Sequence, residues 1–434
     1  MKRKITMVLA VMMIIMSLAG CANKKEAVNG KADTSDEEKV ESIDFMYWNN
    51  GADTPDTLAI EEVIKKYEDT TGIKVNRIVV PEGKFYETLD IRIGGNQAPD
   101  LVRAKYQVMG KYISAGAFEN LDSIIEDETK NNLMDAFKVA VQKDGSYYAM
   151  PWHTDTNAIL YNKRFFEQAG IEVPTKIEDA WSWDEFLDAA RKVQEKSDAK
   201  YGFGVRWFNN ASYRVLPFLY MNNGSMTDAD ITKGNMEDPK SLEFLQFIKT
   251  WVDEGLIPNY TPNSSENPDD LFVNGMSAMA ITGNYMMTTF DTQMKDEYGV
   301  TFMPQVDGKT SSDLGGSGLA VCAKSAKKAE AAKLLNMFLE KENMASLCGK
   351  AGFLPVRNDI SVDELNYEEN AEKMKIFIEQ VSKMDPQMAK LETSVNFSEL
   401  GRVLSDSIEY LMLTDTSTEE VAKSMDTSIN DVLK

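Results

Sequence analysis

Two predicted strands with a helix between them open the body of this chain, and that order constrains the fold more than any other feature. Residues 42–47 (SIDFMY) place apolar side chains on alternate positions, as a strand does, and run into an Asn-Asn-Gly turn. Pro55 after a threonine is typical of a helix start, apolar residues then repeat at helical spacing, and Gly72 ends the helix. Residues 73–80 form the second predicted strand. This unit implies parallel strands with helices packed on the sheet.

The same alternation continues along the chain and predicts an α/β fold class. Ser182 and Glu185 have the spacing of a capping box, which predicts a helix start. The region 370–434 is predicted to be rich in helix. Further strands are predicted near residues 99–102, 147–151, 158–161, 201–205, 277–281, 299–303 and 319–323.

The N-terminal residues have the pattern of a secretory leader. Basic residues at 2–4 precede an apolar run at 5–18, which is too short to span a bilayer, since that takes roughly 20 apolar residues. The run ends in Leu-Ala-Gly-Cys, which resembles a bacterial lipobox and predicts a signal peptide over 1–20 and lipid on Cys21. An ordinary secretory signal with an incidental cysteine is the alternative. Residues 21–41 are polar and are predicted to be a disordered tether.

The composition excludes several classes of function. A formal net charge of −22 opposes binding to nucleic acid or to anionic lipid headgroups. His153 is the single histidine, which excludes a histidine-rich zinc site, and no Cys-x-x-Cys pair replaces it. The Gly-x-Ser-x-Gly and phosphate-loop motifs are also missing from the sequence. Cys322 and Cys348 are expected to be two separate buried thiols, with a disulfide between them as the alternative.

Five motifs follow one another through the chain. They are a strand–Trp–turn–helix–TGIKV segment at 45–75, GNQAPD with AGAF at 95–122, AMP through YNK to WDE at 149–185, FVNGMSAM with ITG at 272–283, and GG with GFLPVR at 315–357. In this order they resemble the extracellular solute-binding proteins of ABC importers, specifically the family-1 group typified by maltose-binding protein. The resemblance covers nearly all of residues 42–434.

The resemblance implies a two-lobed periplasmic-binding-protein fold of the type II kind, in which the chain crosses between the lobes three times at a hinge. The crossings are expected near residues 151–155, 298–304 and 353–357. The implied domains are lobe 1 at 42–152 plus 300–355, and lobe 2 at 153–299 plus 356–434.

A sugar presents apolar C–H faces and a rim of hydroxyls, so its site needs aromatic rings and paired polar groups. Such groups converge in loops at the C-terminal ends of parallel strands. By resemblance and by position in these loops, the candidate ligand-binding residues are Trp48, Asn49, Asn50, Tyr106, Asp155, Trp207, Tyr285, Gly316 and Phe397.

Each candidate has an ordinary structural alternative. Core packing is the alternative for Tyr106 and Phe397, and a hinge-stabilising role is the alternative for Asp155. Arg357 could equally form a salt bridge at the rim, and His153 is interpreted as a polar hinge residue without a catalytic duty.

The function implied is a binding protein for a neutral oligosaccharide that delivers its ligand to ABC permease subunits. It is expected to be a monomer that needs no cofactor and no metal and catalyses no reaction. It is expected at the outer face of the cytoplasmic membrane, attached through lipid alone. A receptor for glycerol phosphate or a polyamine is the first alternative, for which the candidate loops offer only Arg103, Arg206 and Arg357. A lipid-anchored glycosidase with two carboxylates across a cleft is the second.

Overall fold

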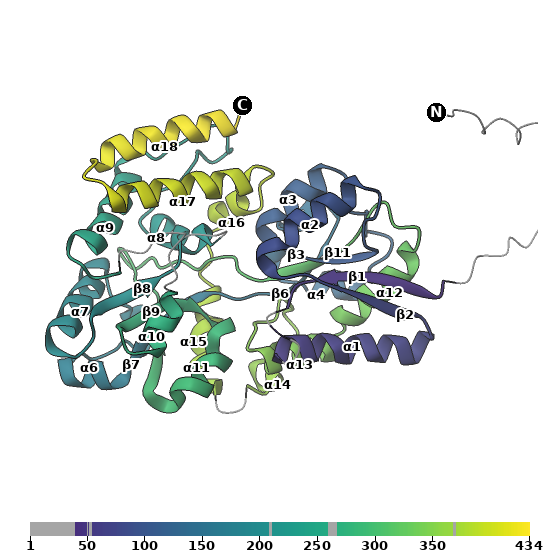
Figure 1. Cartoon of the computed structure of the whole chain (residues 1–434), viewed down its shortest axis with the longest axis horizontal. Helices are drawn as coiled ribbons and strands as arrows, with labels where there is room; N and C mark the ends of the chain where they lie inside the picture. The colour runs from purple at the N-terminus through teal and green to yellow at the C-terminus, as the bar shows by residue number, and fades with distance from the viewer. Residues whose placement is uncertain (1–39, 50, 52–53, 208–210, 259–266, 368–369) are drawn as a thin grey trace, which may run out of the picture. The chain divides into compact units, whose positions relative to one another are not determined.

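Two β-sheets form the frame of the protein, and each draws strands from distant parts of the chain (Figure 1). The computed structural model describes residues 40–49, 51, 54–207, 211–258, 267–367 and 370–434, so the leader, Cys21 and Asn50 lie outside the described residues. The first sheet has the order β2-β1-β3-β11-β6 and the second the order β10-β7-β9-β8. The strands are β1 (Ser42–Tyr47), β2 (Lys74–Val79), β3 (Leu101–Lys105), β6 (Met150–His153), β7 (Asn157–Asn162), β8 (Tyr201–Val205), β9 (Ser277–Gly283), β10 (Tyr298–Thr301) and β11 (Ser317–Val321), with a small hairpin of β4 (Gln142–Lys143) and β5 (Ser146–Tyr147).

The first sheet confirms the strand–helix–strand unit predicted from the sequence. Strands β1 and β2 pair in parallel, and α1 (Pro55–Thr71) connects them. The helix ends at Gly72, whose φ of 71° is the left-handed conformation that glycine adopts without strain. Strand β3 also pairs in parallel with β1, whereas β11 is antiparallel to its neighbours β3 and β6. The α/β fold class is therefore confirmed.

Helices pack around each sheet and divide the described chain into two lobes. The first lobe contains α1, α2 (Glu82–Gly94), α3 (Tyr106–Ser114), α4 (Asp127–Asn132), α5 (Asp135–Lys138), α12 (Lys328–Leu339), α13 (Lys341–Ala351) and α14 (Val362–Leu365). The second lobe contains α6 (Lys163–Ala169), α7 (Trp183–Lys196), α8 (Leu216–Met221), α9 (Pro239–Asp253), α10 (Pro268–Val273), α11 (Met287–Met294), α15 (Ala371–Val381), α16 (Pro386–Glu392), α17 (Phe397–Leu413) and α18 (Thr418–Val432). Helices α17 and α18 lie side by side at the C-terminal end of the chain (Figure 1).

The hydrophobic core covers both sheets. One cluster of buried side chains fills the first lobe and continues over one face of the second sheet, where it includes Leu160 and Ala280. A second cluster covers the other face of that sheet, where Ile159 and Phe203 meet the helices α7, α9 and α17. Neighbouring residues of one strand thus enter different clusters, because side chains alternate between the two faces of a sheet.

The chain passes between the sheets three times. The first crossing runs from β6 to β7 through residues 154–156, near the predicted 151–155. The return comes after β10, which pairs with β7 in the second sheet. Residues 300–301 therefore belong with lobe 2, and the predicted boundary that assigns them to lobe 1 is wrong. The last crossing lies between α14 and α15 rather than near 353–357, because α14 packs on α13 in the first lobe. The other predicted lobe boundaries stay predictions.

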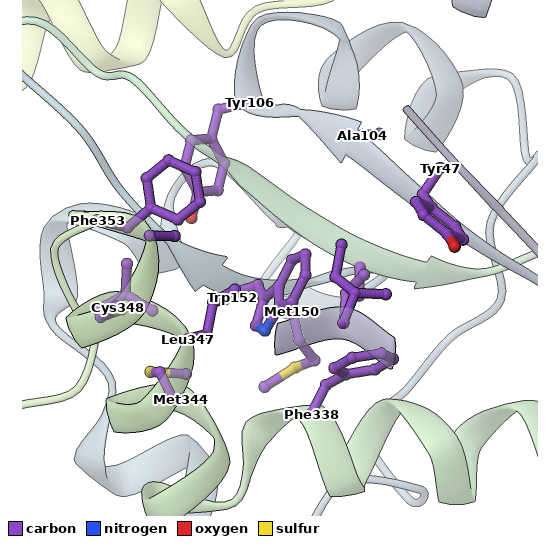
Figure 2. Packing of buried hydrophobic residues seen from close by; sticks show 14 of the residues in the cluster. Tyr47, Ala104, Tyr106, Met150, Trp152, Phe338, Met344, Leu347, Cys348 and Phe353 are labelled. Atoms are coloured by element: carbon purple, nitrogen blue, oxygen red, sulfur yellow. The ribbon is translucent and has the colours of Figure 1, made fainter. Parts of the chain in front are cut away.

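Aromatic and sulfur-containing side chains pack together in the core of the first lobe, among them Met150 and Trp152 of β6 (Figure 2). The rings of Trp152 and Phe338 meet edge to face with centroids 5.2 Å apart. Cys348 lies in the same cluster and is a free, buried thiol, as Cys322 is at its own position. Burial raises the pKa of Cys322 to about 12. The prediction of two separate buried thiols is confirmed.

Among the helices of the described residues, none is both long enough and apolar enough to cross a membrane.

Candidate ligand-binding site

A cavity of about 610 Å³ lies between the two lobes, and strand ends supply much of its lining. From the first lobe, Trp48 follows β1, Arg103 lies within β3 and Lys105 ends that strand. From the second lobe, Arg206 follows β8 and Tyr285 follows β9. The sequence predicts this arrangement, since side chains at the ends of strands in an α/β sheet converge on one edge. We refer to this cavity as the cleft.

The wall from the first lobe is built around the buried side chain of Arg103. Its guanidinium carbon lies 4.2 Å from the ring centroid of Trp48 and 5.4 Å from that of Trp152, so the cation is placed against two π faces. Its Nε donates to Ser317 Oγ at 3.0 Å. The nearest carboxylate with which it pairs is Asp56, at 3.9 Å. Burial lowers the pKa of Arg103 from its ordinary value.

His153 is part of the same wall. Its ring stacks on Phe353 with centroids 4.0 Å apart, and its Nε2 lies 3.0 Å from Arg103 Nη2. Because an arginine can only donate, Nε2 accepts this hydrogen bond, which assigns the ring proton to Nδ1. Burial, and then the charge of Arg103, lower the pKa of His153 well below its ordinary value. The imidazole is therefore neutral at pH 7, and its Nε2 serves as a hydrogen-bond acceptor in this wall.

The wall from the second lobe is built around Arg214, which lies in the short 3-10 helix η2 (Ser212–Val215). Its Nη2 donates to Asp155 at 2.7 Å and its Nη1 donates to Asp313 at 2.7 Å. The guanidinium carbon lies 4.9 Å from the ring centroid of Tyr213 and 4.8 Å from that of Tyr285. Burial alone would lower the pKa of Arg214, but Tyr213 and the carboxylates around it raise it well above its ordinary value.

Charged side chains in the described lining of the cleft occur as oppositely charged pairs. Lys105 pairs with Glu82 and holds the pKa of that carboxyl below its ordinary value. Arg206 lies 3.4 Å from Asp269, whose pKa is raised by burial against the opposing charge of Arg206. The other two pairs are Arg103 with Asp56 and Arg214 with Asp155. The described lining thus combines aromatic rings with polar groups whose charges are compensated within the protein.

The structure brings four of the nine predicted ligand residues into the lining of the cleft: Trp48, Asp155, Tyr285 and Gly316. Gly316 has a φ of 93°, and a Cβ there would collide with the backbone of His153 and Thr154. Glycine is therefore required where this loop passes close to strand β6.

The other predicted residues that the structure describes lie elsewhere. Asn49 is half-buried outside the lining. Tyr106 is fully buried and donates from its hydroxyl to the carbonyl of His153 at 3.0 Å, so it supports the wall from behind. Trp207 is 1% exposed and packs in the core of the second lobe, so its position does not match the predicted ligand platform. Phe397 lines a second cavity of about 410 Å³, which shares Lys105 and Tyr213 with the cleft.

Several lining residues were not among the predicted ligand residues. Tyr213 and Arg214 follow no strand, and no local motif marks them. The sequence marks Arg103 and Arg206 only as partners for a phosphate, and His153 only as a hinge residue. Arg357, the third arginine of the candidate loops, lies outside the cleft and bonds to Asp359 and Glu128 within the first lobe. The signal that was available for Arg103 is its place one strand away from Trp48, at the same edge of the sheet.

Two α/β lobes with a polar, aromatic-lined cleft between them at the strand ends are the architecture of a protein that binds a solute between its lobes. The sequence model of one family, the bacterial extracellular solute-binding proteins, matches residues 51–345. The chain therefore belongs to this family. Members of this family are binding proteins rather than enzymes, and they act outside the cytoplasm.

Similar proteins agree with this placement. A binding protein of Brucella abortus (strain 2308) is 28% identical over 69% of this chain and 72% of its own length. The diacetylchitobiose binding protein DasA of Streptomyces coelicolor is 24% identical over 82% of each chain. Among solved structures, the GacH receptor of Streptomyces glaucescens, studied unliganded and with acarbose, superimposes with a TM-score of 0.78 at 22% identity, over 91% of this chain and 99% of that one. The two-lobed fold predicted from the sequence is confirmed.

Proposed function

We propose that this protein captures a neutral oligosaccharide in the cleft and delivers it to the permease subunits of an ABC importer. The observation that carries the proposal is the chemistry of the described lining, where the rings of Trp48, Tyr213 and Tyr285 lie beside charged groups that each have an opposite charge next to them. Ring faces suit the C–H surface of a sugar, and the compensated ion pairs offer donors and acceptors to hydroxyls without favouring a net charge. Two similar proteins are described with diacetylchitobiose and with acarbose, which supports the same ligand class.

The charge pairing also argues against an anionic or a cationic solute. A phosphate is normally bound by converging cations that are free to neutralise it, whereas Lys105, Arg206 and Arg214 already face carboxylates. A polyamine would need carboxylates in excess. Neither imbalance is present in the described lining of the cleft.

A thermal-shift screen tests the ligand class. The panel contains maltose, maltotriose and N,N′-diacetylchitobiose, with sn-glycerol 3-phosphate and spermidine as the charged comparisons. A ligand at about 100 times its dissociation constant adds roughly 2.7 kcal/mol to the free energy of unfolding. At roughly 2–4 °C per kcal/mol, the melting temperature should rise by about 5–10 °C. A shift with a charged solute and none with any sugar would replace the proposal by the receptor for a charged solute.

The same samples distinguish a receptor from a glycosidase. Each glycan of the panel is incubated with the protein, and the mixture is analysed by chromatography for shorter products. Recovery of the intact glycan is expected. Turnover that disappears when a cleft carboxylate is changed would establish an enzyme.

The proposed location is the outer face of the cytoplasmic membrane, with the mature N-terminus at a lipid-modified Cys21, and the proposed working form is a monomer. The support is the Leu-Ala-Gly-Cys sequence after a basic and apolar leader. A Cys21→Ser variant should leave the membrane fraction on carbonate washing. Retention of that variant with the membranes would contradict lipid anchoring.

A further inference from the structure

Arg214 lies where two of the segments that join the lobes meet. Asp155 belongs to the first crossing, between β6 and β7, and Asp313 belongs to the second, between β10 and β11. Arg214 Nη2 donates to Asp155 Oδ1 at 2.7 Å, and Nη1 donates to Asp313 Oδ2 at 2.7 Å and to Asn157 Oδ1 at 3.0 Å. One guanidinium from the second lobe therefore bonds to both crossing segments at once.

The two carboxylates differ in what they face. Asp313 is fully buried and lies outside the lining of the cleft, and its Oδ1 accepts from Asn157 N at 2.7 Å and from Thr156 Oγ1 at 2.9 Å. Asp155 lines the cleft, and its Oδ2 accepts no side-chain or backbone hydrogen bond from the residues that the structure describes. Asp313 is thus bonded on both oxygens, whereas Asp155 keeps one oxygen for another donor.

A first-lobe segment at Leu354 meets the first crossing at the same place. Thr154 and Leu354 exchange backbone hydrogen bonds of 2.8 and 2.9 Å, and Gly315 N donates to Asp155 O at 3.2 Å. Because the guanidinium is a rigid fork that spans Asp155 and Asp313, any displacement of one carboxylate relative to the other breaks at least one of its charge-assisted bonds.

We propose that Arg214 is the positioning residue of the cleft: it fixes the two crossing segments in register, so that the free oxygen of Asp155 and the rings of Tyr213 and Tyr285 face the ligand together. This inference rests on the proposed function, since it assigns Asp155 Oδ2 as the acceptor for a ligand hydroxyl. Arg214 acts on the ligand through Asp155 and the aromatic rings. A lysine cannot replace it, because a single ammonium cannot donate in the same fork geometry to Asp155 and Asp313.

Three single substitutions separate positioning from simple stabilisation. Arg214→Lys keeps the charge and loses the fork, and Asp313→Asn alters the partner of Arg214 that lies outside the cleft. Arg357→Lys is the matched control, because Arg357 is also a buried arginine that bonds to two carboxylates, but within one lobe. Affinity is measured by calorimetry with maltotriose and with N,N′-diacetylchitobiose as probes. Arg214→Lys and Asp313→Asn should each weaken binding on the order of tenfold or more, whereas Arg357→Lys should stay within about twofold.

A double-mutant cycle then tests the route through Asp155. In an Asp155→Asn background the loss caused by Arg214→Lys should largely disappear, because the oxygen that Arg214 positions has already been changed. Full additivity of the two losses would overturn the proposal. Unchanged affinity in Asp313→Asn, with a loss in Arg214→Lys, would also overturn it, since the arginine would then act by touching the ligand itself. If Arg357→Lys lost as much affinity as Arg214→Lys, the loss would reflect general destabilisation of the protein. That result would also overturn the proposal.

A measurement without ligand keeps this proposal separate from the proposed function. If the unaltered protein binds neither probe, the carbohydrate assignment is in error, and small-angle scattering of the ligand-free variants decides the role of Arg214. Arg214→Lys and Asp313→Asn should then increase the radius of gyration relative to Arg357→Lys, since the crossing segments are no longer held together. Identical scattering from all three variants would overturn the positioning role.

Discussion

The two walls of the cleft each contain a buried arginine, and the two arginines are stabilised in different ways. On the first wall, the guanidinium of Arg103 lies over the rings of Trp48 and Trp152 and donates to the neutral hydroxyl of Ser317. Its carboxylate partner, Asp56, is 3.9 Å away. On the second wall, Arg214 has two carboxylates at 2.7 Å. Burial lowers the pKa of Arg103, whereas the partners of Arg214 raise its pKa.

This difference indicates separate roles for the walls. Arg103 donates mainly to neutral acceptors and its carboxylate partner is more distant, so the first wall can donate to an acceptor oxygen of a neutral ligand. The charge of Arg214 is held by two close carboxylates, so the second wall contributes shape and a fixed acceptor at Asp155. We infer that the first wall supplies a hydrogen-bond donor and the second wall orients the ligand.

The largest expected effect comes from removing each arginine in turn. Arg214→Met leaves Asp155 and Asp313 without their cation, and breaking a buried pair in this way costs about 3–5 kcal/mol of stability. Arg103→Met leaves mainly neutral acceptors without a donor, which should cost about 1–3 kcal/mol. Thermal denaturation of the two ligand-free variants measures the difference. Equal losses would mean that the two arginines are stabilised alike, and the comparison of the walls would fail.

Substitutions of Trp48 and Trp207 extend the comparison of the two walls to ligand affinity. Trp48→Ala removes a ring that lines the cleft and holds Arg103, and the loss of such an anchor should weaken sugar binding by about 2–4 kcal/mol. Trp207→Ala removes a ring that is 1% exposed in the second lobe, so it should lower the melting temperature and leave affinity nearly unchanged.

Calorimetry with maltotriose on the folded variants at low temperature measures both affinities. A strong loss of affinity in Trp207→Ala, with normal binding in Trp48→Ala, would show that the ligand lies deeper in the second lobe than the cleft described here.

A smaller effect is expected from the acceptor on the second wall. Asp155→Asn keeps the size of the side chain but replaces a carboxylate oxygen with an amide, so Arg214 loses a charged partner and the ligand loses an acceptor. Affinity for the sugar should fall by about 1–3 kcal/mol. Titration calorimetry measures this, with Asp56→Asn on the first wall as the comparison, because Asp56 is the more distant partner of Arg103. If only Asp56→Asn weakens binding, the orienting group lies on the first wall.

The sequence was sufficient to predict the parts of this architecture that depend on local patterns. The unit at 42–80, the capping box at Ser182 and the placement of Trp48 and Tyr285 at strand ends all follow from short-range spacing and were found as expected. Two of the predicted ligand residues, Tyr106 and Trp207, are each one residue away from the side chain that lines the cleft. Lys105 ends β3 and lines the cleft, whereas its neighbour Tyr106 begins α3 and is buried. After β8, Arg206 lines the cleft and its neighbour Trp207 packs in the core.

The network of Arg214 could not be predicted in this way. Arg214 is 99 residues before Asp313 and 59 residues after Asp155, and neither its 3-10 helix nor the loop of Asp313 has an apolar period. Only the closure of the chain through its crossings brings the three side chains together. The lobe boundary at β10 was misplaced for a related reason, because which sheet a strand joins depends on pairing with distant residues.

The smallest expected effect is the pH dependence that His153 gives to the first wall. Because the folded pKa of His153 lies well below 6.5, the unfolded chain binds a proton below about pH 6.5 that the folded protein does not bind. The free energy of unfolding should therefore fall as the pH drops below about 6.5, by at most about 1.4 kcal/mol per pH unit from this group. The contribution of buried Glu392 to the free energy of unfolding has the opposite pH dependence. Burial raises the pKa of Glu392 well above its ordinary value, so this group stabilises the folded state as the pH falls.

Denaturant titrations of the unaltered protein and of His153→Gln between pH 5 and 7.5 isolate the contribution of His153 to the free energy of unfolding, since the sequence contains one histidine. The difference between the two proteins should grow in favour of His153→Gln toward pH 5. A constant difference across that range would mean that the imidazole gains its proton in the folded state, and the first wall would then carry a second positive charge beside Arg103.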